Sequence, residues 1–201
     1  MHPNRKFHIQ DREAMAALVS DLGFGILFVP TAEGLRAVHV PVLLDGDCLR
    51  FHVSRGNAVH STLTDGAQAL LVASGPHAYI SPEWYGLEGR VPTWNYVAVE
   101  LEGPVRPIGP EALVRLLDDM SADQEGRLAP KPAWTRAEMS EGRFEGLLKS
   151  ITGFEMLVAD WRGTAKVDQD KPQEVRDRIA DALARRGGRD MAATMRKKAL
   201  S

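Results

Sequence analysis

The chain has 201 residues, of which 44% are hydrophobic and 26% are charged, and its formal net charge at pH 7 is −2. This composition is typical of a folded globular protein and excludes a wholly disordered chain. No apolar run reaches the length of about 18 residues that a transmembrane helix needs, and residues 1–15 lack the apolar centre of a signal peptide. A single cysteine, Cys48, excludes an internal disulfide, so a reducing cytoplasm is the expected compartment.

Charge is distributed unevenly along the chain. Residues 185–201 hold six Lys or Arg and one Asp, a local charge of +5, so the remaining residues carry −7. An acidic body does not resemble a duplex-binding surface, because neutralising phosphates needs clustered Lys and Arg. We expect a single domain over residues 1–186 and a basic, mobile tail over residues 187–201, because the tail is too short to hold an isolated helix. Contact with nucleic acid is the alternative role of this tail.

Hydrophobic spacing predicts the elements in chain order. An amphipathic helix is expected over residues 11–22, with Asp11 as its N-cap. Strands with a period of two residues follow at 24–30, 35–44, 48–53, 67–74, 77–81 and 93–108, interrupted by a short helix from Asn57 to about residue 65. Helices return at 110–120, 140–151 and 172–186, and a last hairpin over 154–161 and 164–169 is expected to turn at Arg162-Gly163. The antiparallel signals predict a mainly β protein with flanking helices, built on a closed barrel.

The dipeptide Asp45-Gly46 is a strong hairpin signal between two predicted strands. A two-residue turn there pairs Leu44 with Asp47 and predicts two like pairs across the strands: His39 opposite His52, and Arg36 opposite Arg55. Opposed cations are unfavourable by a few tenths to about 1 kcal/mol unless an anion lies between them. The alternative is two solvated arginines, each with its own carboxylate.

The segment that leaves the second strand of this hairpin is a candidate phosphate site. Ser54 and Arg55 precede Asn57, which is expected to be the N-cap of the short helix. A helix N-terminus offers free N–H donors, and a guanidinium beside it binds phosphate oxygens in a bidentate manner. The pattern alone is a weak signal, and the predicted histidine pair strengthens it.

Residues 75–100 form the densest aromatic stretch of the chain. Its five Tyr and Trp side chains are suited to stacking on a planar ligand or to filling a subunit interface, and a barrel core is the alternative. The polar tips of His77, Trp94 and Asn95 favour a binding role. Metal binding by the histidines is a minor alternative, because no histidine pair at i, i+4 occurs. No nucleophile motif and no helix-turn-helix is visible.

Three segments carry a family resemblance: HVPVLLDGDCLRFHVSRGN, GPHAYISPEWY and VPTWNY. Together they resemble the PaiB-type FMN-binding negative transcriptional regulators, and the resemblance extends from residue 1 to about residue 172. That family is similar in fold to the pyridoxamine-phosphate-oxidase-like split β-barrels, which bind FMN at a dimer interface. Two departures occur: His2 stands where the family usually has Tyr, and KVDQDKP replaces KxxQNRP, so Asp170 and Lys171 differ.

The resemblance implies an antiparallel split β-barrel of the FMN-binding type, FMN as the cofactor and a homodimer. It implies an FMN site drawn from Arg36, His39, His52, Val53, Ser54, Arg55, Asn57, Ser74, His77, Trp94, Asn95, Lys166 and Gln169. The alternatives are a flavin-dependent oxidoreductase of unknown substrate and a haem-binding split-barrel protein. A role in transcription rests on the resemblance alone, since the charge does not support direct contact with DNA, and no catalytic residue is identified.

Overall fold

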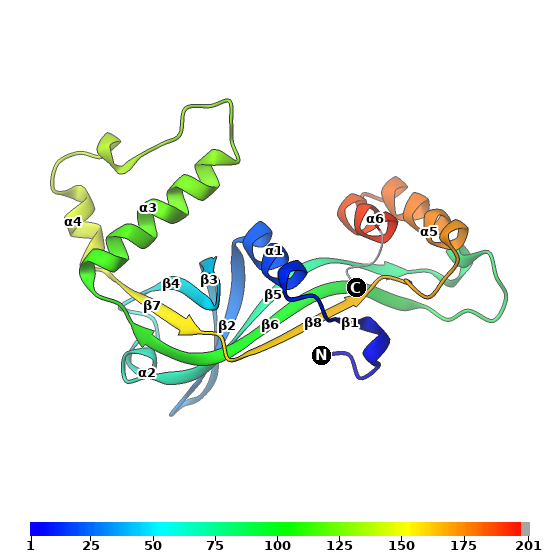
Figure 1. Cartoon of the computed structure of the whole chain (residues 1–201), viewed down its shortest axis with the longest axis horizontal. Coiled ribbons are helices and arrows are strands. Elements are labelled where there is room, and N and C mark those ends of the chain that lie inside the picture. The colour runs from blue at the N-terminus through cyan, green and yellow to red at the C-terminus, as the bar shows by residue number, and fades with distance from the viewer. Residues whose placement is uncertain (198–201) are drawn as a thin grey trace. The chain divides into compact units, whose positions relative to one another are not determined.

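The computed structural model describes residues 1–197, which divide into two compact units. The ring unit consists of residues 19–72 and 101–160, and the terminal unit consists of residues 1–18, 73–100 and the described part of 161–201. Strands β5 (Ala67–Ile80) and β6 (Thr93–Pro107) run through both units, as does helix α1 (Arg12–Leu22) (Figure 1). Within residues 1–197, no helix is long and apolar enough to cross a membrane.

The ring unit is a closed antiparallel sheet. Its other strands are β2 (Phe24–Thr31), β3 (Gly34–Asp45), β4 (Cys48–Ser54) and β7 (Ile151–Leu157). The strands follow the order β5-β2-β3-β4-β7, and β6 pairs with both β7 and β5, so the ring closes. The predicted barrel with flanking helices is therefore confirmed.

The inside of the ring follows from the period of two residues along each strand. Alternate side chains of β2 and β4 are buried, and Phe51 stacks on Phe154 of β7 with ring centroids 5.8 Å apart. Three helices complete the unit: α2 (His60–Thr64), α3 (Pro110–Gly126) and α4 (Arg143–Leu148). Helix α3 buries Leu113 and Leu116 and packs against β7, which places α3 and α4 beside that strand (Figure 1).

The β3–β4 hairpin has a different register from the predicted one. Asp45 pairs with Cys48, so the loop is Gly46-Asp47, and Gly46 takes the positive φ of +57° that such a turn needs. Val42 consequently pairs with Phe51. The shift is two residues, and because side chains alternate with a period of two, every side chain keeps its predicted face while its partner changes.

The terminal unit holds the outer strands of the sheet, in the order β1-β8-β6-β5, with β1 (His8–Ile9) and β8 (Asp160–Lys166). Two short 3-10 helices flank them, at Arg5–Phe7 and Pro82–Tyr85. The predicted hairpin with a turn at Arg162-Gly163 is wrong, because both residues lie inside β8, which pairs with β1. Gly163 instead permits a close approach, since a Cβ there would lie 2.8 Å from both Ile9 Cβ and Met15 Sδ.

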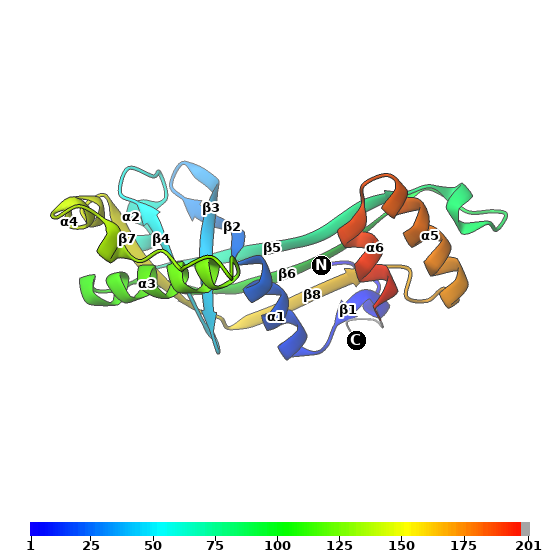
Figure 2. The same cartoon turned by 90° about the horizontal axis from the view of Figure 1, so that it is seen from above.

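Two helices lie side by side at the end of the terminal unit: α5 (Gln173–Arg185) and α6 (Arg189–Arg196) (Figure 2). Met191 and Met195 of α6 are buried, at 2% and 0% exposure. Buried Arg176 of α5 donates hydrogen bonds to the carbonyl oxygens of Met195 and Lys197. Residues 189–196 therefore form a helix that packs on α5, and the mobility of the tail over residues 187–201 stays a prediction. Residues 198–201 lie outside the described part, and the single domain over 1–186 stays a prediction.

Candidate functional site

The turn after β4 holds three of the predicted site residues. Strand β4 ends at Ser54, whose carbonyl oxygen accepts a hydrogen bond from the Asn57 N–H at 3.0 Å and whose Oγ accepts one from the Gly56 N–H at 3.3 Å. Helix α2 begins only at His60, with Val59 as its N-cap, so the predicted N-cap role of Asn57 is wrong. The Asn57 side chain instead accepts a hydrogen bond from the Val59 N–H and shapes the turn.

Arg55 extends from this turn into solvent with most of its donors unused. Its backbone N–H donates to the Ser150 carbonyl at 2.8 Å, and its Nε donates to the Ile151 carbonyl at 3.2 Å, so the turn is fixed against the start of β7. Among the described residues, Arg55 forms no ion pair. The terminal nitrogens of its guanidinium are free to bind a ligand.

Arg55 lines a hollow of about 310 Å3 in the ring unit. Lys149 also lines it and forms no ion pair within residues 1–197. Thr152 contributes a hydroxyl, held 2.8 Å from Nε2 of His60. The other lining side chains are mainly apolar: Ile108, Pro110, Leu113, Leu148 and Ile151. Two unpaired cations in a hollow with mainly apolar walls form a site that attracts an anionic group.

The histidine and arginine pairs predicted across the hairpin do not form. The β3–β4 pairing is shifted by two residues and covers only Val42–Asp45 of β3, so it does not reach His39 or Arg36. Both residues pair with β2, His39 with Ile26 and Arg36 with Val29. The Arg36 guanidinium forms an ion pair with the Glu33 carboxylate at 3.2 Å. For Arg36, the alternative of an arginine with its own carboxylate therefore holds. His39 is exposed and stacks on Phe24 with ring centroids 6.3 Å apart.

His52 and Val53 of β4 lie toward the body of the ring unit. His52 pairs with Gly153 of β7, and its Nδ1 is buried without a hydrogen-bond partner in the described part of the chain. Burial lowers the pKa of His52 below its usual value, because the low-polarity surroundings disfavour the charged imidazolium. Val53 is buried in the core at 3% exposure, so its side chain offers nothing to a ligand outside the ring.

The terminal unit presents an exposed aromatic cluster, which we define as His77, Tyr79 and Trp94. The Trp94 ring lies 6.1 Å from the His77 ring and 6.3 Å from the Tyr79 ring. Trp94 is 56% exposed and Tyr79 is 46% exposed, and Ser74 of β5 is exposed as well. Aromatic surface left open to water in this way is typical of ligand-stacking or subunit interfaces.

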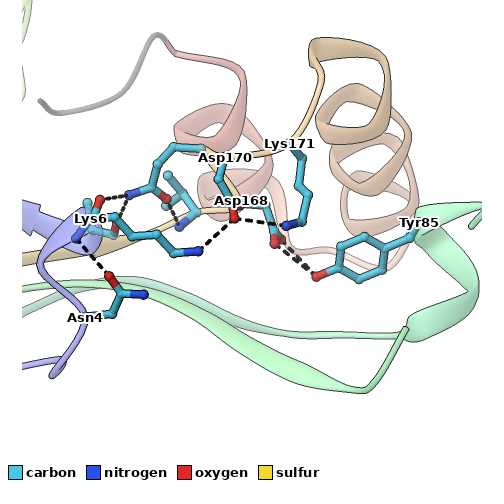
Figure 3. A network of polar contacts seen from close by, with 9 residues as sticks. Asn4, Lys6, Tyr85, Asp168, Asp170 and Lys171 are labelled. Atoms are coloured by element: carbon cyan, nitrogen blue, oxygen red, sulfur yellow. Dashed lines mark hydrogen bonds and ion pairs between the residues drawn. The ribbon is translucent and has the colours of Figure 1, made fainter. Parts of the chain in front are cut away.

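Asn95 belongs to a buried polar network rather than to an open surface. Its side-chain N–H donates to Asp168 Oδ2 at 2.7 Å. The Tyr85 hydroxyl donates to both Asp168 oxygens at 3.0 and 3.2 Å, and Figure 3 shows these two side chains facing each other. Burial, followed by the neighbouring Asp168 carboxylate, raises the pKa of Tyr85 above its usual range and keeps the hydroxyl protonated as a donor. Asp168 takes a φ of +56°, a conformation that Asp tolerates better than most residues.

The predicted site residues Lys166 and Gln169 lie in the same segment, and their polar groups bind the protein itself. Lys166 Nζ donates to the Trp94 carbonyl at 2.6 Å, and burial lowers the pKa of this amine. The Gln169 amide accepts from the Val167 N–H and donates to the Ala165 carbonyl at 2.6 Å. These groups hold the segment in shape.

The two positions that depart from the family pattern are used in a local ion-pair cluster. Asp170 pairs with Lys6 at 2.8 Å and with Lys171 at 3.0 Å, and Figure 3 shows all three side chains together. Although burial alone would raise it, the hydrogen bonds from Lys6 and Lys171 hold the pKa of Asp170 below its usual value. Sequence reasoning missed Lys6, Tyr85 and Asp168 here, and it missed Lys149 in the ring unit.

Comparison with known proteins identifies the family. The family described as "Putative FMN-binding domain" matches residues 1–160 of this chain. The chain belongs to this family. The PAI 2 protein of Bacillus subtilis (strain 168), named "Protease synthase and sporulation protein PAI 2", is 30% identical over 176 residues, which cover 85% of this chain and 83% of that relative. The resemblance to PaiB-type proteins that three sequence segments predicted is confirmed.

Solved structures share the fold at low sequence identity. The FAD and haem binding protein from Mycobacterium smegmatis has a TM-score of 0.60 and 18% identity, over 79% of this chain and 73% of that one. The flavocytochrome Anf3 from Azotobacter vinelandii has a TM-score of 0.61 and 13% identity, over 82% of this chain and 72% of that one. With the ring of strands, these likenesses support the split β-barrel of the FMN-binding type as the fold class.

Proposed function

We propose that this protein binds FMN and holds the terminal phosphate with Arg55 and Lys149. The observation that carries the proposal is the pair of cations that line one hollow of the ring unit without a carboxylate partner among the described residues. Two exposed cations at one hollow act together on an anion, because their electrostatic potentials add there and raise the local concentration of negatively charged ligands. Membership of the FMN-binding domain family supplies the flavin as the ligand.

The residues present suit a phosphate monoester. The Arg55 guanidinium presents two parallel N–H groups to phosphate oxygens, and Lys149 adds a second positive charge. The Gly56 and Asn57 N–H groups are already used within the turn, so the two side chains carry the recognition. When bound, FMN supplies transfer of one or two electrons at its ring system. The role of this chain is to anchor and orient it.

A direct titration tests the cofactor. The apo-protein is titrated with FMN and with riboflavin, which lacks the phosphate. We expect Arg55→Ala to weaken FMN binding by about 1.5–3 kcal/mol, the scale of a hydrogen bond to a charged group, and to leave riboflavin binding unchanged. Arg115→Ala is the matched control, because Arg115 is an exposed arginine of α3 that lies outside the hollow.

Two results would overturn the cofactor proposal. Equal affinity of the natural protein for FMN and riboflavin would remove the phosphate contact. An absorbance spectrum of the purified protein with a Soret band and no flavin bands would favour the haem-binding alternative. FAD serves as a third ligand and should bind more weakly, since its two phosphates are joined by an anhydride bond and each offers one negative charge to Arg55 and Lys149 rather than the nearly two of a monoester.

We also propose that the protein is a homodimer. The outer face of β2, β3 and β5 is apolar and open, with Leu35 at 66% and Phe24 at 50% exposure. A hollow of about 350 Å3 on this face is lined by Phe28, Leu35 and Leu70 among others. Exposed apolar side chains gathered on one face in this way mark a protein interface, and the family resemblance favours a second copy as the partner.

Light scattering tests the dimer. We expect twice the chain mass of 22.1 kDa at micromolar concentration, and we expect Leu35→Asp to shift the protein toward the monomer. Leu157→Asp is the control, because Leu157 is 61% exposed but does not line the apolar hollow of this face. A monomer in the natural protein would contradict the proposal.

A role in transcription is proposed from the family resemblance only, and the acidic body makes direct DNA binding the weaker form of it. The basic residues 185–197 are the candidate for contact with DNA phosphates, because Lys and Arg are clustered there. Gel-shift titration with duplex DNA at two salt concentrations distinguishes direct DNA binding from regulation through a partner protein. Salt-sensitive binding that Arg189→Gln and Arg196→Gln abolish would support direct contact, whereas no binding would place the regulation in a partner protein.

A further inference from the structure

We propose a second ligand site in the ring unit that takes a small aromatic organic anion, such as an aromatic carboxylate or sulfonate. The site is a hollow of about 340 Å3 enclosed by α3, the segment 127–142 and α4. Its volume lies within the range of small-molecule sites, at roughly 300–1,000 Å3. This inference does not depend on flavin binding.

The apolar part of the site is open to water. Trp134 is 38% exposed and Leu147 is 53% exposed, and both line the hollow together with Leu117 of α3. Large apolar side chains gathered around a concave surface gain free energy when a ligand covers them, at about 25 cal/mol per Å2 of buried area. The presence of both Trp134 and Phe144 favours a planar aromatic ligand over a branched aliphatic one.

The wall that carries Trp134 is fixed to α3 before any ligand arrives. The Glu125 carboxylate of α3 accepts a hydrogen bond from the backbone N–H of Trp134 at 2.9 Å and also forms an ion pair with Lys131. Thr135 and Glu138 form a reciprocal capping box one residue further along. A site whose walls are held in this way loses less conformational entropy on binding, so its affinity is higher.

Two arginines give the site its preference for an anion. The Arg136 guanidinium shares Asp118 of α3 at 3.3 Å and lies over the Phe144 ring at 5.2 Å. Arg143 lines the same hollow, is exposed, and forms no ion pair in the part of the chain that the structure describes. One carboxylate therefore faces two guanidinium groups, and the remaining positive charge attracts an anionic group on the ligand.

This hollow differs from the one that Arg55 lines. Leu148 and Ile151 line both, but the cations do not overlap: Arg136 and Arg143 belong to the first, and Arg55 and Lys149 to the second. Variants on either side therefore distinguish the two proposals. Arg55→Ala should weaken FMN without affecting the aromatic anion, and Arg143→Gln should do the reverse.

Fluorescence titration of the full chain tests the site with two probes. 1-Anilinonaphthalene-8-sulfonate is an aromatic anion, and N-phenyl-1-naphthylamine is a neutral molecule of similar shape. We expect the sulfonate to bind with about one site per chain. We expect Arg143→Gln to weaken it about tenfold, the scale of one desolvated charge contact, and to leave the neutral probe unchanged. Leu147→Glu should abolish binding of both probes.

Two matched controls make the test decisive. Arg115→Gln removes an exposed arginine of the same helix α3, and Leu157→Glu places a charge at an equally exposed leucine; neither residue lines the hollow. Both controls should bind the sulfonate as the natural chain does. Equal weakening by the controls, several sulfonate molecules bound per chain, or insensitivity to Leu147→Glu would each show general adhesion to apolar surface and overturn the proposal.

Discussion

Two segments that the sequence assigned to one cofactor site behave differently in the structure. At Ser54–Arg55, the cation is exposed and most of its donors are unused. At Lys166–Lys171, the amine, the amide and the carboxylates bind other groups of the protein. Residues of the same chemical types therefore keep unused donors in one place and bind other groups of the protein in the other. Counting unused donors distinguishes the two roles, whereas residue type alone does not.

The largest loss of stability is expected on removal of α6, the helix that covers the network around the segment Lys166–Lys171. Met195 Sδ lies 3.7 Å from the Asn95 side-chain nitrogen, so α6 shields the buried network. A chain that ends at Gly188 loses the burial of Met191 and Met195, and we expect its free energy of unfolding to fall by about 4 kcal/mol. Denaturant titration measures it. Ala193→Ser, on the exposed face of α6, is the control and should change little. An unchanged midpoint for the shortened chain would instead support the mobile tail.

Asp168→Ala tests whether the network is structural. The change leaves the Asn95 amide and the Tyr85 hydroxyl without their acceptor and places Ala at a φ of +56°. We expect the free energy of unfolding to fall by about 3 kcal/mol. Asp190→Ala, at an exposed position of α6, should cost less than about 0.5 kcal/mol. Loss of FMN affinity without loss of stability would make Asp168 a ligand-binding residue and would contradict a purely structural role of this segment.

Lys149→Ala tests the second exposed cation of the ring-unit hollow. Because its ammonium forms no ion pair within residues 1–197, we expect the free energy of unfolding to change by less than about 0.5 kcal/mol. FMN affinity should fall by about 1 kcal/mol, less than for Arg55→Ala, since Lys presents a point charge rather than a bidentate fork. Calorimetric titration measures the affinity. A stability loss larger than the affinity loss would assign Lys149 to the fold.

The smallest effect concerns His52. Its pKa is lowered in the folded state by burial, so the unfolded chain binds the proton more readily. The contribution of His52 to stability should therefore decrease as the pH falls below the usual value of 6.5 and should be constant above it. His52→Gln should remove part of this slope, whereas His39→Gln, at an exposed histidine, should keep it. Equal slopes in both variants would show that His52 titrates normally.

Element positions were predictable because patterning reports burial. The helix at 11–22 appears as α1, and Asp11 accepts hydrogen bonds from the N–H groups of Glu13 and Ala14. The limits of β2, β3, β4 and β6 were predicted within one residue for the same reason, since alternate side chains face the core. The two strands predicted at 67–74 and 77–81 are instead the single strand β5, and β7 and β8 begin three to four residues before their predicted starts. The hairpin register was not predictable, because Asp45-Gly46 and Gly46-Asp47 are both acceptable turns. The two choices place the same side chains inside the ring.

The site was predictable only where it is local in sequence. Arg55 stands in a recognisable turn, whereas Lys149 reaches the same hollow because β4 pairs with β7, with Ser54 opposite Ile151. Such non-local pairing leaves no signal in a single sequence. Helix α6 was missed for a related reason: a helix this short is marginal alone and is stabilised by packing on α5.

The buried arginine of α5 has a consequence for inheritance. Arg176 has 8% exposure and donates to carbonyl oxygens at the end of α6, so its charge is balanced by backbone dipoles of another helix. Helices α5 and α6 follow the stretch of residues 1–160 that matches the domain family. Removal of α6 takes away these acceptors and exposes the guanidinium to water, so the arginine is needed only where α6 is present, and lysine cannot replace its forked geometry. The arginine and the last helix should therefore be gained and lost together among relatives.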